Sequence, residues 1–177
     1  MLPTAIFQID MALGYLAWAV CIATYLWPWL RAMDRVAAQR AIATLHSFRF
    51  FGLVFLLPGF VGPNLPEVFA TPAAYGDLAT ALLAILALLT VRVRLLFWPL
   101  VWAFNLVGLA DLVMNTVRAV AMDLPSMAGQ LGAAYAIVML YVPVLVLTHL
   151  LAFWLLLRPA PVPARSAGAP LPLAATE

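Results

Sequence analysis

The stretch LLFWPLVWAFNLVGLADLVMNTVRAVAM, residues 95–122, decides what kind of protein this is. It runs without a charged side chain as far as Asp111, and a bilayer crossing needs about 20 mostly apolar residues. Four further stretches have the same character, and they cover residues 5–30, 41–61, 76–91 and 129–157. The sequence therefore predicts an all-α, polytopic membrane bundle of five transmembrane helices, formed by residues 1–158.

The composition of the whole chain agrees with this interpretation. Of the 177 residues, 67% are hydrophobic and 9% are charged, whereas a globular domain carries about 25% charged residues. So little polar surface excludes a soluble fold, and the single cysteine, Cys21, excludes a disulfide-stapled scaffold. The cations are scattered arginines with a net charge of +2, so we expect no nucleic-acid partner. Because lysine is absent, Schiff-base chemistry is excluded too.

The arginines predict how the chain is oriented in the membrane. Those outside the predicted helices all fall in alternate loops and in the tail: Arg31, Arg35, Arg40, Arg92, Arg94, Arg158 and Arg165. The intervening loops, residues 62–75 and 123–128, contain no arginine. Since cytoplasmic loops are enriched in basic residues, the amino terminus is expected outside and the carboxyl terminus inside, in a bacterial inner membrane. The tail, residues 159–177, is rich in proline and alanine and is expected to be disordered in the cytoplasm.

Two charged residues are predicted at the middle of the membrane. Arg49 lies nine residues beyond Arg40, about 13 Å along a helix, and Asp111 lies twelve residues before Asp123. A charge at that depth costs about 2.5–3.5 kcal/mol and therefore needs a partner inside the bundle. We expect Arg49 and Asp111 to form an intramembrane ion pair.

Further polar residues are expected near this pair. Asn105 is a candidate hydrogen-bond partner, and Asp111, Asn115 and Arg118 share one helix face at spacings of i, i+4 and i+7. The group is interpreted either as a structural pin or as a ligand site or ion path, in which Arg49 recognises an anionic group. Asp10 and Asp77 are expected at the outer interface, solvated or capping, with Asp77 in the first turn of its helix.

The two histidines lie at similar predicted depths on different helices. His46 follows Arg40 by six residues, and His149 precedes Arg158 by nine. Four interpretations stay open: hydrogen bonding between helices, axial ligation of a b-type haem, a proton relay, or a metal site completed by Cys21. Enzyme activity is less favoured, because the sequence has no phosphate-binding loop, nucleophile elbow or His-Glu-x-x-His pair.

Two resemblances to known proteins can be stated. The segments LHSFRFFGL (residues 45–53) and PAAYGD (residues 72–77) are similar to stretches in small uncharacterised bacterial multi-pass membrane proteins, which imply no activity. The expected span number, the length and the tryptophan content resemble the tryptophan-rich sensory proteins, which bind porphyrins and cholesterol. That resemblance is architectural, because the Trp-Pro-rich first loop and the Asn-x-x-Trp segment of that family are absent here.

The sequence thus predicts an integral membrane protein with a polar site between its second and fourth spans. The favoured hypothesis is that this site binds or passes a small hydrophobic or amphipathic ligand, a solute or a proton. The alternatives are a redox protein with haem between His46 and His149, and a non-catalytic accessory subunit of a membrane complex. A homo-oligomer is compatible with each of these functions.

Overall fold

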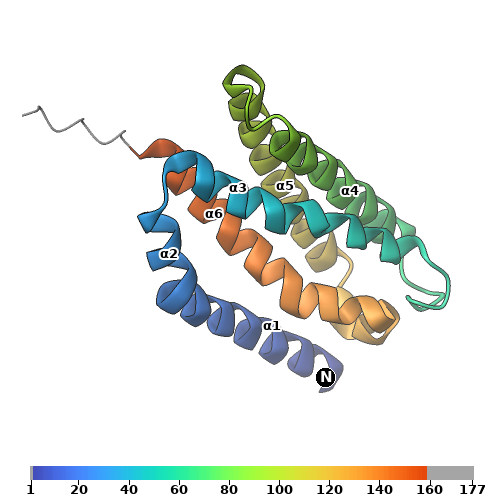
Figure 1. Cartoon of the computed structure of the whole chain (residues 1–177). Helices are drawn as coiled ribbons and strands as arrows, with labels where there is room; N and C mark the ends of the chain where they lie inside the picture. The colour runs from blue at the N-terminus through green and yellow to red at the C-terminus, as the bar shows by residue number, and fades with distance from the viewer. Residues whose placement is uncertain (1, 159–177) are drawn as a thin grey trace, which may run out of the picture.

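The computed structural model describes residues 2–158, and its named elements within that range are all helices (Figure 1). The α-helices are α1 (Leu2–Cys21), α2 (Trp27–Ala32), α3 (Arg35–Ser47), α4 (Glu67–Leu89), α5 (Arg94–Ala121) and α6 (Val142–Leu157). Between them lie two π-helical turns, η1 (Ile22–Leu26) and η4 (Ile137–Tyr141), and two 3-10 segments, η2 (Phe48–Leu56) and η3 (Leu124–Ala134). The predicted tail lies outside the described residues.

Four continuous helical segments are long and apolar enough to cross a membrane, which indicates a membrane protein: Leu2–Ala32, Glu67–Leu89, Arg94–Ala121 and Ile137–Leu157. The prediction of five such helices is wrong. The predicted span 41–61 is not one long α-helix, because α3 ends at Ser47 and the chain tightens into η2.

The 3-10 winding of η2 has a clear consequence for its side chains. A 3-10 helix has about three residues per turn, so residues three apart lie above one another. Arg49, Gly52 and Phe55 follow this spacing, and they are the buried residues of η2. Phe50 and Phe51, between them, are exposed. The tighter winding therefore directs Arg49, Gly52 and Phe55 toward the interior of the bundle.

Two other predicted boundaries also differ in the structure. α4 begins at Glu67, whereas the span was predicted from Gly76, so the second half of the predicted loop, residues 62–75, is helical. The last long helix begins at Ile137, because residues 124–134 form η3, in which Gly132 has a positive φ of 52°. The earlier start of α4 lengthens that helix, and η3 adds a separate helical segment. Both changes lie at the end of the bundle opposite the arginines.

The two π-helical turns each precede a proline, Pro28 and Pro143. Proline lacks an N–H and clashes with the preceding turn, so a wider turn accommodates it. The wider turn also offers carbonyl groups to α1. Trp18 Nε1 donates to the Leu140 carbonyl at 2.7 Å, and Gly14 packs directly against the Met139 carbonyl. These contacts fasten α1 to the rest of the bundle.

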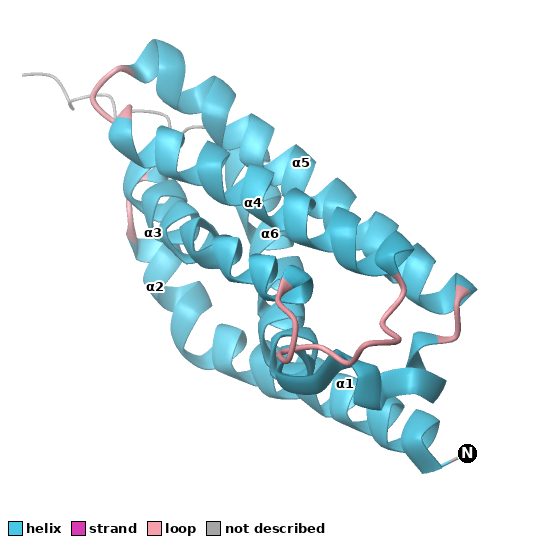
Figure 2. Cartoon of the chain, turned by 90° about the vertical axis from the view of Figure 1, so that its right-hand side faces the viewer, coloured by secondary structure: helices cyan, strands magenta, loops and turns pink. Residues whose placement is uncertain are grey.

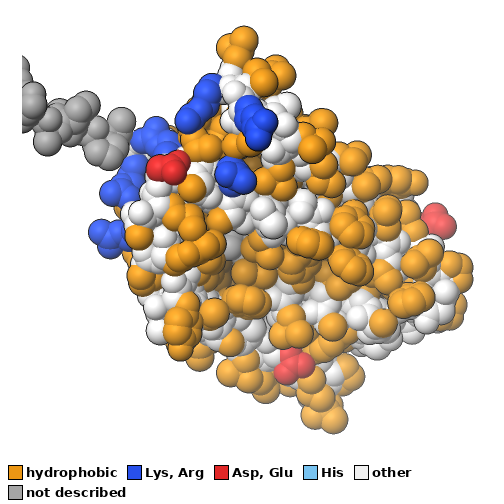
Figure 3. All heavy atoms as spheres, viewed as in Figure 1, with side chains coloured by type: hydrophobic (Ala, Val, Ile, Leu, Met, Phe, Trp, Pro, Cys, Tyr) orange, Lys and Arg blue, Asp and Glu red, His pale blue; other side chains and the backbone are white. Residues whose placement is uncertain are grey.

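The helices lie side by side and alternate in direction (Figures 1 and 2), and arginine side chains gather at one end, near α2 and the start of α3 (Figure 3). Two hydrophobic clusters fill the interior. The arginine-end cluster consists of Leu30, Ala38, Ile42, Ala43, Ala84, Ala87, Phe97, Val101, Phe104, Ala152 and Leu155. The far-end cluster consists of Phe7, Phe55, Leu65, Phe69, Ala70, Ala73, Ala74, Leu124, Ala128, Leu131, Ala134, Val138 and Met139.

A layer of buried polar residues separates the two clusters. Along α3 and η2, His46 and Arg49 fall between Ile42 of one cluster and Phe55 of the other. The other helices repeat this order, with buried polar residues at intermediate positions: Asp77, Thr80, Asn105, Thr148 and His149. The fold therefore gathers most of its buried polar side chains at one level of the bundle; Gln39, buried within the arginine-end cluster and donating to the Ala152 carbonyl at 2.9 Å, is the exception among the described residues.

Candidate functional site

Arg49 is the centre of the polar layer and has no exposed surface. Its Nε donates to Asp77 Oδ1 at 2.7 Å, and its Nη2 donates to Asp111 Oδ2 at 2.7 Å. The expected pairing of Arg49 with Asp111 is therefore present in the structure. The expectation for Asp77 is wrong, because this residue is 9% exposed and lies well inside α4, which begins at Glu67.

His149 receives the third interaction of Arg49. Arg49 Nη1 lies 3.2 Å from His149 Nε2, and a guanidinium can only donate, so Nε2 is the acceptor and the ring proton is on Nδ1. That Nδ1 lies 2.9 Å from Asn105 Oδ1, while Asn105 Nδ2 donates to the Val101 carbonyl at 2.8 Å. Asn105 thus orients His149, whereas the sequence suggested it as a partner of the ion pair.

His46 lies directly beside His149, with ring centroids 3.9 Å apart. Thr148 donates its hydroxyl to the Val144 carbonyl at 2.6 Å, so its oxygen accepts from His46 Nε2, which lies 3.1 Å away. Within the described residues, His46 Nδ1 has no hydrogen-bond partner. The two histidines are therefore brought together as neutral rings of opposite tautomer.

The haem and metal hypotheses do not fit this geometry. The imidazoles of His46 and His149 are in direct contact, with planes tilted by 35°, which leaves no room for a porphyrin between them. Both nitrogens of His149 face other side chains. Cys21 does not complete a metal site, since residues 2–158 contain no group of three potential ligands close enough to hold an ion.

Three glycines make room for the polar layer. A Cβ atom added at Gly76 would collide with the Asp111 carboxylate, and one at Gly52 would collide with Asp77. At Gly108 it would lie 2.6 Å from Arg49 Nη1 and would also strike His149. The polar side chains of the layer therefore pack directly against the glycine backbone of a neighbouring helix. This close contact holds the network in one arrangement.

The network continues along α5. Asn115 Nδ2 donates to Asp111 Oδ1 at 2.9 Å, and Arg118 Nη1 donates to Asn115 Oδ1 at 3.0 Å. The predicted common face of Asp111, Asn115 and Arg118 is thus a chain of hydrogen bonds. Asn115 occupies the second oxygen of Asp111 and so fixes the orientation of that carboxylate.

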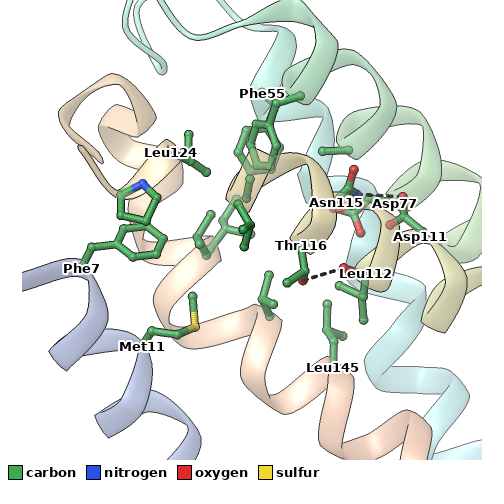
Figure 4. Close-up of a pocket in the computed structure, with 18 of the residues that line it drawn as sticks. Phe7, Met11, Phe55, Asp77, Asp111, Leu112, Asn115, Thr116, Leu124 and Leu145 are labelled. Carbon is green, nitrogen blue, oxygen red and sulfur yellow. Dashed lines mark hydrogen bonds between the residues drawn. The ribbon is translucent and has the colours of Figure 1, made fainter. Parts of the chain in front are cut away.

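A cavity of about 230 Å³ adjoins the polar layer on the side of the far-end cluster. Asp77, Asp111 and Asn115 lie on its wall, and the rest of the lining is mostly apolar. Figure 4 shows these three residues at one side of the cavity and Phe7, Met11, Phe55 and Leu124 at the other. Arg49 does not line the cavity: the carboxylates that it holds face the space instead.

The sequence did not reveal Asp77 or the aromatic walls of this cavity. Asp77 lies ten residues after Glu67, about 15 Å along α4, which is a mid-membrane depth once the true start of that helix is known. Phe7 and Phe55 carried no signal, because an apolar ring in an apolar span has the same pattern whether it faces lipid or a cavity.

Comparisons with known proteins give a family. The chain belongs to the family described as a domain of unknown function (DUF8737), whose model matches residues 6–157. No curated protein and no solved structure matches the chain.

Proposed function

We propose that this protein binds a small amphipathic ligand within the membrane, in the cavity beside the polar layer. The observation that carries the proposal is the division of the cavity lining into two parts. Asp77, Asp111 and Asn115 supply a compact polar region, and apolar side chains supply the rest. Small-molecule sites are typically concave and mostly apolar, with few well-placed polar groups that fix orientation.

The polar groups are held ready for a ligand. Arg49 fixes both carboxylates from behind at 2.7 Å, and Asn115 fixes the free side of Asp111. The glycines at positions 52, 76 and 108 pack closely against these side chains and restrict their movement. A ligand therefore meets hydrogen-bond acceptors that are already ordered in the folded protein. Binding then costs less side-chain entropy, which favours affinity.

α1 forms the most peripheral wall of the cavity. Phe7, Met11 and Tyr15 of this helix line the space. Only 17% of the most apolar window in Leu2–Ala32 is buried, against 33–39% in the three other long helices. Movement of α1 away from the bundle would connect the cavity with the lipid, so we place the entry route for an apolar ligand on this side.

The proposed topology places the cavity in the outer half of an inner membrane. The helical path from Arg35 to Leu56 carries the chain from the arginine end to the opposite end, where α4 begins. With the arginines in the cytoplasm, the start of α1 lies outside. The cavity then adjoins the outer side of the polar layer, and His46 lies toward the cytoplasmic side of Arg49.

The test uses 2-phenylethanol as a probe with an apolar body and a hydroxyl head. We expect it to raise the melting temperature of the protein in lipid nanodiscs, with saturation at increasing concentration. Ala119→Phe fills the cavity and should abolish the shift, because Ala119 lines the space. Ala110→Phe is the matched control on the same helix, since Ala110 is exposed and does not line the cavity.

The control variant decides how a positive result is interpreted. A shift that persists unchanged in Ala119→Phe would show that the probe acts through the lipid and would contradict the proposal. A shift present in the parent protein and in Ala110→Phe, but absent in Ala119→Phe, supports ligand binding in the cavity.

A further inference from the structure

The charges around the cavity do not balance at the polar layer. Two carboxylates, Asp77 and Asp111, share the one guanidinium of Arg49. Arg118 is the next cation along α5, and it bonds to Asn115 rather than to a carboxylate. Within residues 2–158, Asp77 and Asp111 form ion pairs with Arg49 alone.

The surplus negative charge is placed where a ligand would meet it. Asp77 and Asp111 line the cavity and keep 13% and 9% of their side-chain surface exposed, whereas Arg49 is fully buried and Arg118 is not on the cavity wall. A molecule in the cavity therefore meets carboxylate oxygens and an amide, with the balancing guanidinium behind them. The sequence suggested Arg49 as an anion-recognising group, and this arrangement points to the opposite charge.

We propose that the cavity takes a small organic cation, an amine whose ammonium group lies against Asp77 and Asp111 and whose apolar body fills the rest. This inference rests on the proposed function and specifies the chemical class of its ligand. An ammonium group compensates the second carboxylate inside a medium where an unpaired charge is costly. A carboxylate or phosphate head would add a further negative charge to the same region.

The remaining cavity wall suits the body of such a ligand. Phe7, Tyr15, Phe55 and Phe69 contribute aromatic rings, and Phe55 packs edge-on against Phe69 with ring centroids 5.8 Å apart. Aromatic faces attract organic cations and also pack against apolar groups. The wall therefore accepts both parts of an arylalkyl or alkyl amine.

The experiment compares three probes that share one aromatic body. 2-Phenylethylamine, 2-phenylethanol and 3-phenylpropionate are titrated into the protein in phosphatidylcholine nanodiscs, whose zwitterionic lipid adds no net charge. Binding is followed by the shift in melting temperature, and apparent affinities are compared. Because only the ammonium adds a charge–charge attraction to the carboxylates, and about 1.4 kcal/mol corresponds to a tenfold change in affinity, the amine should bind about tenfold to hundredfold more tightly than the alcohol. The propionate should bind more weakly than either.

Charge variants on the cavity wall make the test specific. Asp77→Asn and Asp111→Asn each remove one carboxylate from the wall, and each should lower the preference for the amine over the alcohol. Asp123→Asn is the matched control, since Asp123 is absent from the cavity lining and asparagine tolerates its left-handed backbone, with φ of 51°. It should leave the preference unchanged.

Each outcome supports or overturns one of the two proposals. Equal affinity for the amine and the alcohol, both lost in Ala119→Phe, would overturn the cationic head while leaving the binding cavity intact. No saturable binding of any probe would overturn both proposals. If Asp111→Asn fails to fold, Asp77→Asn decides: an unchanged preference for the amine overturns the inference, and a lowered one supports it.

Discussion

The two ends of the bundle differ in how closely they are packed. In the arginine-end cluster, most members have no exposed surface, including Ala38, Ala43, Ala84 and Ala87. In the far-end cluster, most members keep a few per cent of their surface exposed, and the cavity lies among them. The two regions are equally apolar, so hydrophobicity does not explain the difference.

The difference follows from the type of helix in each region. The arginine-end cluster is formed mainly by α3, α4, α5 and α6, whose small alanine side chains allow close approach of regular helices. The far end includes η2, η3 and η4, whose windings differ from that of an α-helix. Side chains on helices of unequal pitch do not interdigitate along their length, and this leaves the hollow that we propose as the ligand site.

The largest effect is expected when the layer between the two ends is broken. Arg49→Met leaves Asp77 and Asp111 buried without a cation. Removal of one partner from a buried ion pair typically costs about 3–5 kcal/mol, so the variant should unfold at a much lower temperature in detergent or fail to accumulate. Thermal unfolding followed by circular dichroism measures the loss.

Compensating and matched variants show whether charge is the cause. Combining Arg49→Met with Asp77→Asn and Asp111→Asn removes the unpaired charges and should restore part of the stability. Arg118→Met removes a cation of the same type that is half-buried and bonded to an amide, and should cost less. If the triple variant were less stable than Arg49→Met alone, unpaired charge would not be the reason for the loss.

Much of the fold could be predicted because a membrane imposes simple rules on the sequence. The long apolar stretches identified four of the helices, and the arginines outside them that the structure describes lie at one end of the bundle (Figure 3). Counting residues from charged boundaries placed Arg49 and Asp111 at one depth, and they bond in the structure. Helical spacing placed Asp111, Asn115 and Arg118 on one face. The depth of a residue in the membrane and the helix face on which it lies both follow from counting residues along the chain, so a single sequence predicts them.

The rest depends on contacts that hydropathy does not encode. Asp77 was misplaced because Pro72 and the turn residues before Glu67 resemble an interfacial loop, whereas α4 continues through them. Gly52 of the 3-10 segment η2 packs directly against Asp77 of α4, a contact between helices that hydropathy does not encode. His46 and His149 were predicted at similar depths, but their direct contact was not predicted, because ring contact and ligation of a haem require the same depth and only the ring geometry separates them.

A smaller effect should distinguish the packing of the two ends directly. Ala84→Leu inserts three heavy atoms into the closed arginine-end cluster, where Ala84 is fully buried, and should cost about 1–3 kcal/mol. Ala119→Leu makes the same substitution on the cavity wall and should be neutral or slightly stabilising, because the added atoms enter open space. Melting temperatures in one detergent compare the pair. Equal losses in the two variants would contradict the difference in packing.

The smallest effect is expected inside the polar layer, at His46. His46→Phe keeps a ring beside His149, loses one hydrogen bond to Thr148 and removes Nδ1, a buried atom without a partner among the described residues. Thr148 still donates to the Val144 carbonyl, so we expect a cost of about 1 kcal/mol or less. His149→Phe is the matched variant and should cost clearly more, since it leaves Arg49 Nη1 and Asn105 Oδ1 without their shared partner. Thermal unfolding of both variants gives the order directly. A larger loss at His46 than at His149 would contradict the assignment of His149 as the histidine that supports Arg49.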